Sequence, residues 1–247
     1  MKKHIPNTLT CCNLLSGCAA TMMALQGCFL YAFLLIILGA VFDFFDGFAA
    51  RLLHVSSDIG KELDSLADDI TFGFAPAAIV FSLLRSLLAP EHLPQGFPFT
   101  ESRLLEWLPY AAFLIAAFSA LRLAKFNIDP RQATTFIGLP TPANALFWGS
   151  LSVALERDGW LVGEPWLAIP VLLGVILACW LLVAEIPMFA LKFKHFKWQG
   201  NELRYAFILC SAILLASLQW MGFATVIILY VLTSIMNNLL GTKIAEE

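Results

Sequence analysis

The chain has 247 residues, of which 60% are hydrophobic and only 13% are charged, and its mean hydropathy is +0.79. Soluble domains are about 45–50% apolar and about 25% charged, so this composition excludes an ordinary soluble domain and indicates a protein of the lipid bilayer. The formal net charge is −3, and no basic stripe follows any part of the sequence. Nucleic acid is therefore not an expected partner.

Eight apolar stretches approach the length of about 20 residues that a helix needs to cross the hydrocarbon core. In chain order they lie near 8–26, 28–50, 64–88, 108–126, 140–156, 167–190, 204–220 and 222–240. The polar breaks between them are too short to hold a soluble domain. We therefore expect an all-α fold, a polytopic transmembrane helical bundle that forms a single integral membrane domain over residues 1–247.

The basic residues predict the orientation, because Lys and Arg collect on the cytoplasmic side of membrane proteins. With eight spans and a cytoplasmic N-terminus, 12 of the 15 basic residues fall on that side: Lys2, Lys3, Arg51, Lys61, Arg122, Lys125, Arg131, Lys192, Lys194, Lys197, Arg204 and Lys243. The other side receives Arg85, Arg103 and Arg157. We expect a multi-pass protein of the cell's inner membrane with both termini in the cytoplasm.

The first span carries polar residues that need an explanation. A lipoprotein-like cleavage box is readable at 15–18 behind two lysines, but Asn7, Thr10 and Asn13 interrupt the apolar core that a signal segment requires. These three side chains can instead cap a helix or line a nucleotide site. We favour the nucleotide site.

Four aspartates lie where the second span ends and the third begins. Asp43 and Asp46 are three residues apart and Asp64 and Asp68 are four apart, so each pair shares a helix face. Carboxylates at a membrane span are costly and indicate function. Four converging carboxylates repel one another unless cations hold them, and oxygen ligands suit Mg²⁺ or Mn²⁺. The sequence therefore predicts two divalent metal ions, which can clamp a pyrophosphate.

The residues around these aspartates suit a phosphate ligand. Gly47 and Gly60 allow close approach of the backbone, and the Arg51 guanidinium suits phosphate. The alternative is that each aspartate is an ordinary helix-end charge, solvated by headgroups and paired with Arg51 or Lys61. The number and spacing of the aspartates favour a site over that alternative.

The complete pattern is Asp43-x2-Asp46-Gly47-x2-Ala50-Arg51-x8-Gly60-x3-Asp64-x3-Asp68. It resembles the signature of the CDP-alcohol phosphotransferase family at all eight fixed positions. The resemblance implies a six-helix catalytic core over about 5–200 with two additional C-terminal spans over 204–240. It also implies a homodimer, a binuclear metal site, and displacement of CMP from a CDP-linked donor by an alcohol.

The resemblance further implies a role for each position of the pattern. Asp43, Asp46 and Asp64 correspond to metal ligands. Asp68 corresponds to the fourth aspartate, a ligand or neighbour of the metal that deprotonates the acceptor hydroxyl. The nucleotide-binding positions correspond to Gly47, Ala50, Arg51 and Gly60. A general base also suits the chemistry, because an alcohol is a weak nucleophile.

Further strings resemble one branch of the family, the bacterial and archaeal phosphatidylserine synthases. They are Ile5-Pro6-Asn7-x2-Thr10-x2-Asn13, Asp64-Ser65-Leu66-Ala67-Asp68, Ala120-Leu121-Arg122-Leu123-Ala124-Lys125-Phe126-Asn127 and Phe136-Ile137-Gly138-Leu139-Pro140-x-Pro142. This resemblance covers about residues 5–145. It implies CDP-diacylglycerol and L-serine as substrates, with phosphatidylserine and CMP as products of a step in phospholipid biosynthesis.

A zwitterionic acceptor needs a cation for its carboxylate and an oxygen for its ammonium group. Arg122, Lys125 and Asn127 gather at the cytoplasmic end of the fourth span and can supply both. The alternative is that Arg122 and Lys125 only set the membrane orientation and Asn127 only caps a helix.

Other functions fit the sequence less well. Within the family, the acceptor could be glycerol phosphate, inositol phosphate or choline, although a phosphorylated acceptor would call for more basic residues near the site. An ion or proton transporter would place its carboxylates near the bilayer midplane, whereas these four lie at one membrane face. A non-enzymatic scaffold conflicts with a complete set of metal ligands.

Overall fold

The computed structural model describes residues 4–55, 57–93, 104–129, 136–161, 164–188, 198 and 201–239. The described helices of the first half are α1 (His4–Leu25), α2 (Phe29–Leu52), α3 (Asp58–Asp68), the π-helix η1 (Asp69–Phe74), α4 (Ala75–Leu87), the 3₁₀ turn η2 (Pro90–His92), α5 (Leu104–Trp107), the 3₁₀ segment η3 (Leu108–Phe113) and α6 (Leu114–Ile128). The second half contains α7 (Thr141–Arg157), the 3₁₀ turn η5 (Pro165–Leu167), α8 (Ala168–Val183), α9 (Glu202–Leu218) and α10 (Trp220–Leu239).

The prediction of a polytopic helical membrane protein is confirmed. Six described segments are long and apolar enough to cross a bilayer: His4–Leu25, Phe29–Leu52, Asp58–Leu87, Leu105–Ile128, Pro165–Val183 and Trp220–Leu239. The predicted fifth and seventh spans are also helices, α7 and α9, but each has 17 residues and is shorter than those six. Several residues used for the orientation lie outside the described parts: Lys2, Lys3, Arg103, Arg131, Lys192, Lys194, Lys197 and Lys243.

One small feature departs from an all-helical chain. Two short strands, β1 (Phe136–Ile137) and β2 (Pro187–Met188), pair antiparallel, with Phe136 opposite Met188. The pairing joins the segment before α7 to the segment after α8. It therefore holds the start of α7 close to the end of α8.

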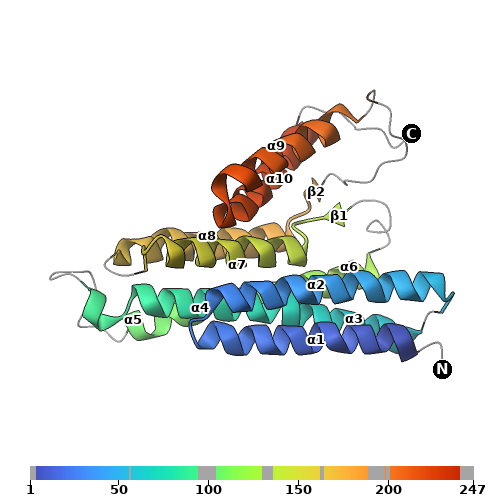
Figure 1. Cartoon of the computed structure of the whole chain (residues 1–247), viewed down its shortest axis with the longest axis horizontal. Coiled ribbons are helices and arrows are strands. Elements are labelled where there is room, and N and C mark those ends of the chain that lie inside the picture. Colours follow the sequence, from blue (N-terminus) through green and yellow to red (C-terminus); the bar gives the residue numbers. More distant parts are fainter. Residues whose placement is uncertain are drawn as a thin grey trace.

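The helices form two packed layers and a tilted hairpin. Figure 1 shows α1, α2, α3–α4 and α6 running side by side, with α7 and α8 laid along them and the α9–α10 hairpin leaning away at an angle. α1 and α2 form an antiparallel pair because the chain reverses at Gly27, where φ is +76° and a glycine carries no steric penalty. α4 is the most enclosed helix, with almost every residue buried.

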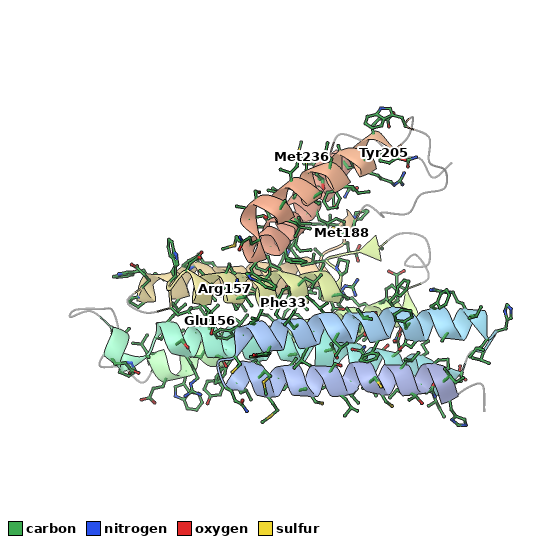
Figure 2. The ribbon with its side chains drawn as sticks, viewed as in Figure 1. Phe33, Glu156, Arg157, Met188, Tyr205 and Met236 are labelled. Carbon is green, nitrogen blue, oxygen red and sulfur yellow. The ribbon has the colours of Figure 1, made fainter. Side chains whose placement is uncertain are left out.

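Aromatic side chains join the layers. Phe33 on α2 lies 6.1 Å from the ring of Trp220 and 5.6 Å from that of Phe223, both edge to face. Figure 2 shows Phe33 between the first layer and α7. Such contacts hold α2 to α7 and α10 through packing, because lipid tails are as apolar as the helix surfaces and provide little hydrophobic driving force between helices.

The third span is one continuous helical segment with a π-helical turn in its middle. η1 starts directly after Asp68, and π-turns of this kind often occur at functional sites. Thr71 of η1 is fully buried and donates a hydrogen bond of 3.0 Å to the backbone carbonyl of Asn13. Gly17 and Gly39 leave the space that Thr71 occupies, since a Cβ on Gly17 would come within 2.7 Å of the Thr71 Cα. This close packing draws α1, α2 and the third span together beside the aspartates.

Candidate active site

The four aspartates lie on two adjacent segments of the bundle. Asp43 and Asp46 come from α2, and Asp64 and Asp68 come from α3. One carboxylate oxygen from each of Asp43, Asp64 and Asp68 lies within 4.8 Å of the others. Asp46 is buried and lines the same cavity as Asp64. The structure therefore brings the predicted carboxylates together.

The surroundings of these carboxylates fit divalent cations. The Asp64 Oδ1 atom is buried and has no hydrogen-bond partner within the described parts of the chain. Three negative groups at this spacing repel one another strongly where water is scarce. Burying an unpaired carboxylate is costly, and oxygen-rich sets of this kind are typical ligands of hard cations. The residues therefore fit a Mg²⁺ or Mn²⁺ site.

Two polar residues of α1 hold the aspartates in place. Thr10 Oγ1 donates a 2.6 Å hydrogen bond to Asp46 Oδ2, and Asn13 Nδ2 donates a 3.1 Å bond to Asp68 Oδ1. Thr10 and Asn13 are almost completely buried, so these bonds form in a poorly hydrated environment. The polar residues that interrupt the first span thus orient two carboxylates, a contact that their sequence pattern did not predict.

A cavity of about 260 Å³ opens beside the aspartates. Its walls come from α1, α2, the α2–α3 connection and α3: Pro6, Asn7, Thr10, Asp46, Gly47, Ala50, Val55, Ser57, Gly60, Lys61 and Asp64. Most of the predicted nucleotide-binding residues line it, whereas Asn13 and the exposed Arg51 do not. A Cβ on Gly47 would meet no atom within 4 Å, so this glycine leaves open space at the wall.

The start of α3 adds features that sequence reasoning did not assign to the site. Ser57 caps the helix, accepting a 3.1 Å hydrogen bond from the backbone N–H of Gly60. The first turn of α3 therefore faces the cavity with the positive end of its dipole, which favours phosphate groups. A Ser-x-x-Gly string before a polar helix start is the signal that could have pointed to this cap.

The three predicted acceptor residues lie in different surroundings. Arg122 is only 5% exposed, lies within electrostatic range of Asp68, and has its guanidinium carbon 5.9 Å from the Phe126 ring centre. Its Nε atom has no hydrogen-bond partner among the residues that the structure describes. Lys125, in contrast, is exposed.

Asn127 joins α6 to α3. Its Nδ2 donates a 2.7 Å hydrogen bond to Ser65 Oγ, and its backbone carbonyl accepts a 3.2 Å bond from Lys61 Nζ. Five residues on a helix correspond to a rotation of roughly 140°, so Asn127 and Arg122 cannot share a face. Of the three residues, Arg122 is the one that is buried within electrostatic range of Asp68.

Comparison with known proteins agrees with this geometry. The profile of the CDP-alcohol phosphatidyltransferase family matches residues 3–191, which include all four aspartates and Arg122. The chain belongs to this family. The matched part ends before α9 and α10.

Curated relatives from three organisms share one name, CDP-diacylglycerol–serine O-phosphatidyltransferase. The chain is 34% identical to the CDP-diacylglycerol–serine O-phosphatidyltransferase of Bacillus subtilis over 205 residues, which cover 81% of this chain and 94% of that protein. The enzyme of that name in Helicobacter pylori is 29% identical over 219 residues, covering 87% and 83% of the two chains. The one in Methanocaldococcus jannaschii is 34% identical over 142 residues, 58% of this chain and 57% of the relative. The likeness to this family that its motifs indicate is thereby confirmed.

Proposed function

We propose that the protein transfers the phosphatidyl group of CDP-diacylglycerol to L-serine and releases CMP. The observation that carries the proposal is the cluster of Asp43, Asp64 and Asp68, which meets through Asp64 a cavity that is also lined by Gly47 and Gly60 of the family signature. The names of the three relatives support serine as the acceptor.

The aspartates have two tasks in this proposal. Asp43, Asp46, Asp64 and Asp68 would hold two divalent cations, Mg²⁺ or Mn²⁺, which supply positive charge for the pyrophosphate and for the phosphoryl group during transfer. Thr10 and Asn13 keep two of these carboxylates in position through the hydrogen bonds described above.

The cavity between α1, α2 and α3 would receive the CDP part of the donor. The space beside Gly47 admits a ligand close to the backbone, and Gly60 lies in the first turn of α3, whose N–H groups favour the pyrophosphate. Asn7 and Ala50 contribute to the same wall. Arg51 is exposed next to this opening. Its guanidinium would bind the phosphate groups of the donor as the donor enters the cavity.

Asp68 would act as the general base. The Asn13 bond occupies Asp68 Oδ1, so Oδ2 is the oxygen that can accept the proton of the serine hydroxyl. The serine oxygen forms a bond to the phosphorus of the phosphatidyl group, while the bond between that phosphorus and the bridging oxygen breaks. CMP leaves with the electron pair, and the proton passes from Asp68 to solvent.

Arg122 would bind the carboxylate of serine, because its guanidinium is buried near Asp68 and offers a fork that matches a carboxylate. Lys125 and Asn127 would act around this pocket. Lys125 would attract the carboxylate of serine, and the hydrogen bond from Asn127 to Ser65 would hold α6 against α3.

The assembly and location follow from the same reasoning. We propose a single membrane domain whose catalytic core spans about 5–200 and whose α9 and α10 are additional. The distribution of Lys and Arg supports an inner-membrane protein with cytoplasmic termini and a cytoplasmic active site. The family resemblance supports a homodimer.

One assay tests the proposal. Purified protein is supplied with CDP-diacylglycerol, with Mg²⁺ or Mn²⁺, and in turn with serine, glycerol phosphate, inositol phosphate or choline, and CMP release is measured. We expect serine to give the highest rate. A higher rate with another alcohol would overturn the choice of serine, and no CMP release with any of them would overturn the transferase.

A further inference from the structure

The first turn of α7 contains buried polar groups that the protein leaves unpaired. Thr141 and Asn144 are each only 1% exposed. Thr141 Oγ1 and both polar atoms of the Asn144 amide have no hydrogen-bond partner within the described parts of the chain. Unpaired buried polar atoms cost folding free energy, and three of them in one helical turn indicate that something else binds there.

The same turn is an open helix N-terminus. α7 begins after Pro140, which provides no side-chain cap. The first N–H groups of a helix have no partner within the helix, and the dipole makes this end attractive to anions. Thr141 and Asn144 therefore add side-chain donors to an end that already favours negative charge.

A buried cation, Arg122, lies on α6, and α6 and α7 both pack against the same element, η1. η1, which directly follows Asp68, packs against both α6 and α7. Arg122 projects from α6, is 5% exposed and interacts with Asp68. Its Nε has no partner among the residues placed by the structure. Figure 1 shows α7 starting at its end nearer to where α2 finishes and α3 begins.

We propose that Thr141 and Asn144, at the N-terminus of α7, bind the carboxylate of the amino-acid acceptor together with Arg122. This inference rests on the proposed function, and it adds two specificity-determining residues to the site. A carboxylate has two oxygens and about four acceptor positions, so it can use the guanidinium fork and the helix end at once. An alcohol without a carboxylate, such as ethanolamine, would leave these donors unpaired, so the arrangement predicts a preference for serine over ethanolamine.

The test uses near-isosteric substitutions with a matched control. Asn144→Leu and Thr141→Val remove the side-chain hydrogen-bonding groups while keeping similar volume. Ser152→Ala is the control, because Ser152 lies on the same helix, is fully buried and has a hydroxyl without a partner in the described structure. It is eleven residues beyond Thr141, roughly 16 Å along the helix axis.

Four quantities are measured for each variant: the KM for serine, the KM for CDP-diacylglycerol, CMP release by water in the absence of acceptor, and the ratio of rates with serine and ethanolamine. We expect Asn144→Leu and Thr141→Val each to raise the serine KM by about tenfold or more, as for a lost hydrogen bond to a charged group. The ratio of the rate with serine to the rate with ethanolamine should fall in the same variants. The donor KM and the water reaction should stay at the wild-type level, and Ser152→Ala should change none of the four.

The inference is overturned if the serine KM stays within about twofold of wild type in both variants, or if Ser152→Ala shifts it equally, or if the donor KM rises by the same factor. Size-exclusion chromatography in detergent reports folding, and Thr141→Val decides the result if Asn144→Leu does not fold. Failure of the proposed function looks different, because the wild-type protein itself would then prefer another acceptor.

Discussion

Asp68→Asn separates the two tasks assigned to this residue, because it changes charge and basicity but almost no volume. The substituted amide keeps an oxygen that can accept the hydrogen bond from Asn13, which is 3.1 Å long in the structure. The local packing should therefore persist. If Asp68 is the general base, its loss should lower kcat by about 10²–10⁴, equivalent to about 2.7–5.4 kcal/mol in the activation barrier.

The assay follows both binding and turnover. Binding of CDP-diacylglycerol is measured by equilibrium titration in detergent with Mg²⁺ present, and kcat is measured from CMP release at saturating serine. Asp58→Asn is the control, because Asp58 lies on the same helix but is exposed at its first turn. If Asp68→Asn abolishes donor binding as fully as turnover, Asp68 is chiefly a metal ligand and the assignment of the base is refuted.

Three further changes test other parts of the site. Asp64→Asn should abolish CMP release while the protein stays folded in detergent, and near-normal turnover would contradict its role as a metal ligand. Thr10→Val removes the 2.6 Å bond to Asp46 and should raise the Mg²⁺ concentration for half-maximal activity about tenfold; an unchanged metal titration would count against that positioning role. Arg122→Lys should raise the KM for serine by a factor corresponding to about 1.5–3 kcal/mol with donor binding preserved, whereas a purely topological role predicts no change.

The aspartate cluster could be predicted because its spacing is local. Positions three and four apart share a helix face, and two helices joined by a short turn must bring their adjoining ends together. Asp43, Asp64 and Asp68 do meet in the structure. The helical-bundle fold class could also be predicted, since the length and apolarity of each span follow directly from the sequence.

The supporting contacts could not be predicted because their partners are distant in sequence. Thr10 lies 36 residues from Asp46, and Asn13 lies 55 residues from Asp68. The pattern marked these residues as polar interruptions of the first span, but tertiary packing determines what they contact. The π-turn after Asp68 is a further example, because no local motif marks it and its residue Thr71 packs against the backbone of neighbouring helices.

The acceptor side shows the same limit more clearly. Arg122, Lys125 and Asn127 look like one group in the sequence, but Asn127 is five residues from Arg122, a rotation of about 140°, and lies on another face. Arg122 and Lys125 share a face by their spacing, yet Arg122 is buried and Lys125 is exposed. Thr141 occupies the variable position of a motif that the sequence makes visible. Its relevance depends on burial and on the missing hydrogen-bond partner, which only the structure reveals.

The C-terminal hairpin lies after the part of the chain that matches the family, and no motif in it predicts a role. Its helices differ in packing, because α9 contacts chiefly α10 whereas α10 lies along α7. Tyr230 of α10 packs against the buried cluster of Leu139, Leu181 and Met188. These three residues belong to the part of the chain that matches the family. α10 therefore covers the end of the matched part, and the packing of that part depends on a helix outside the segment that identifies the family.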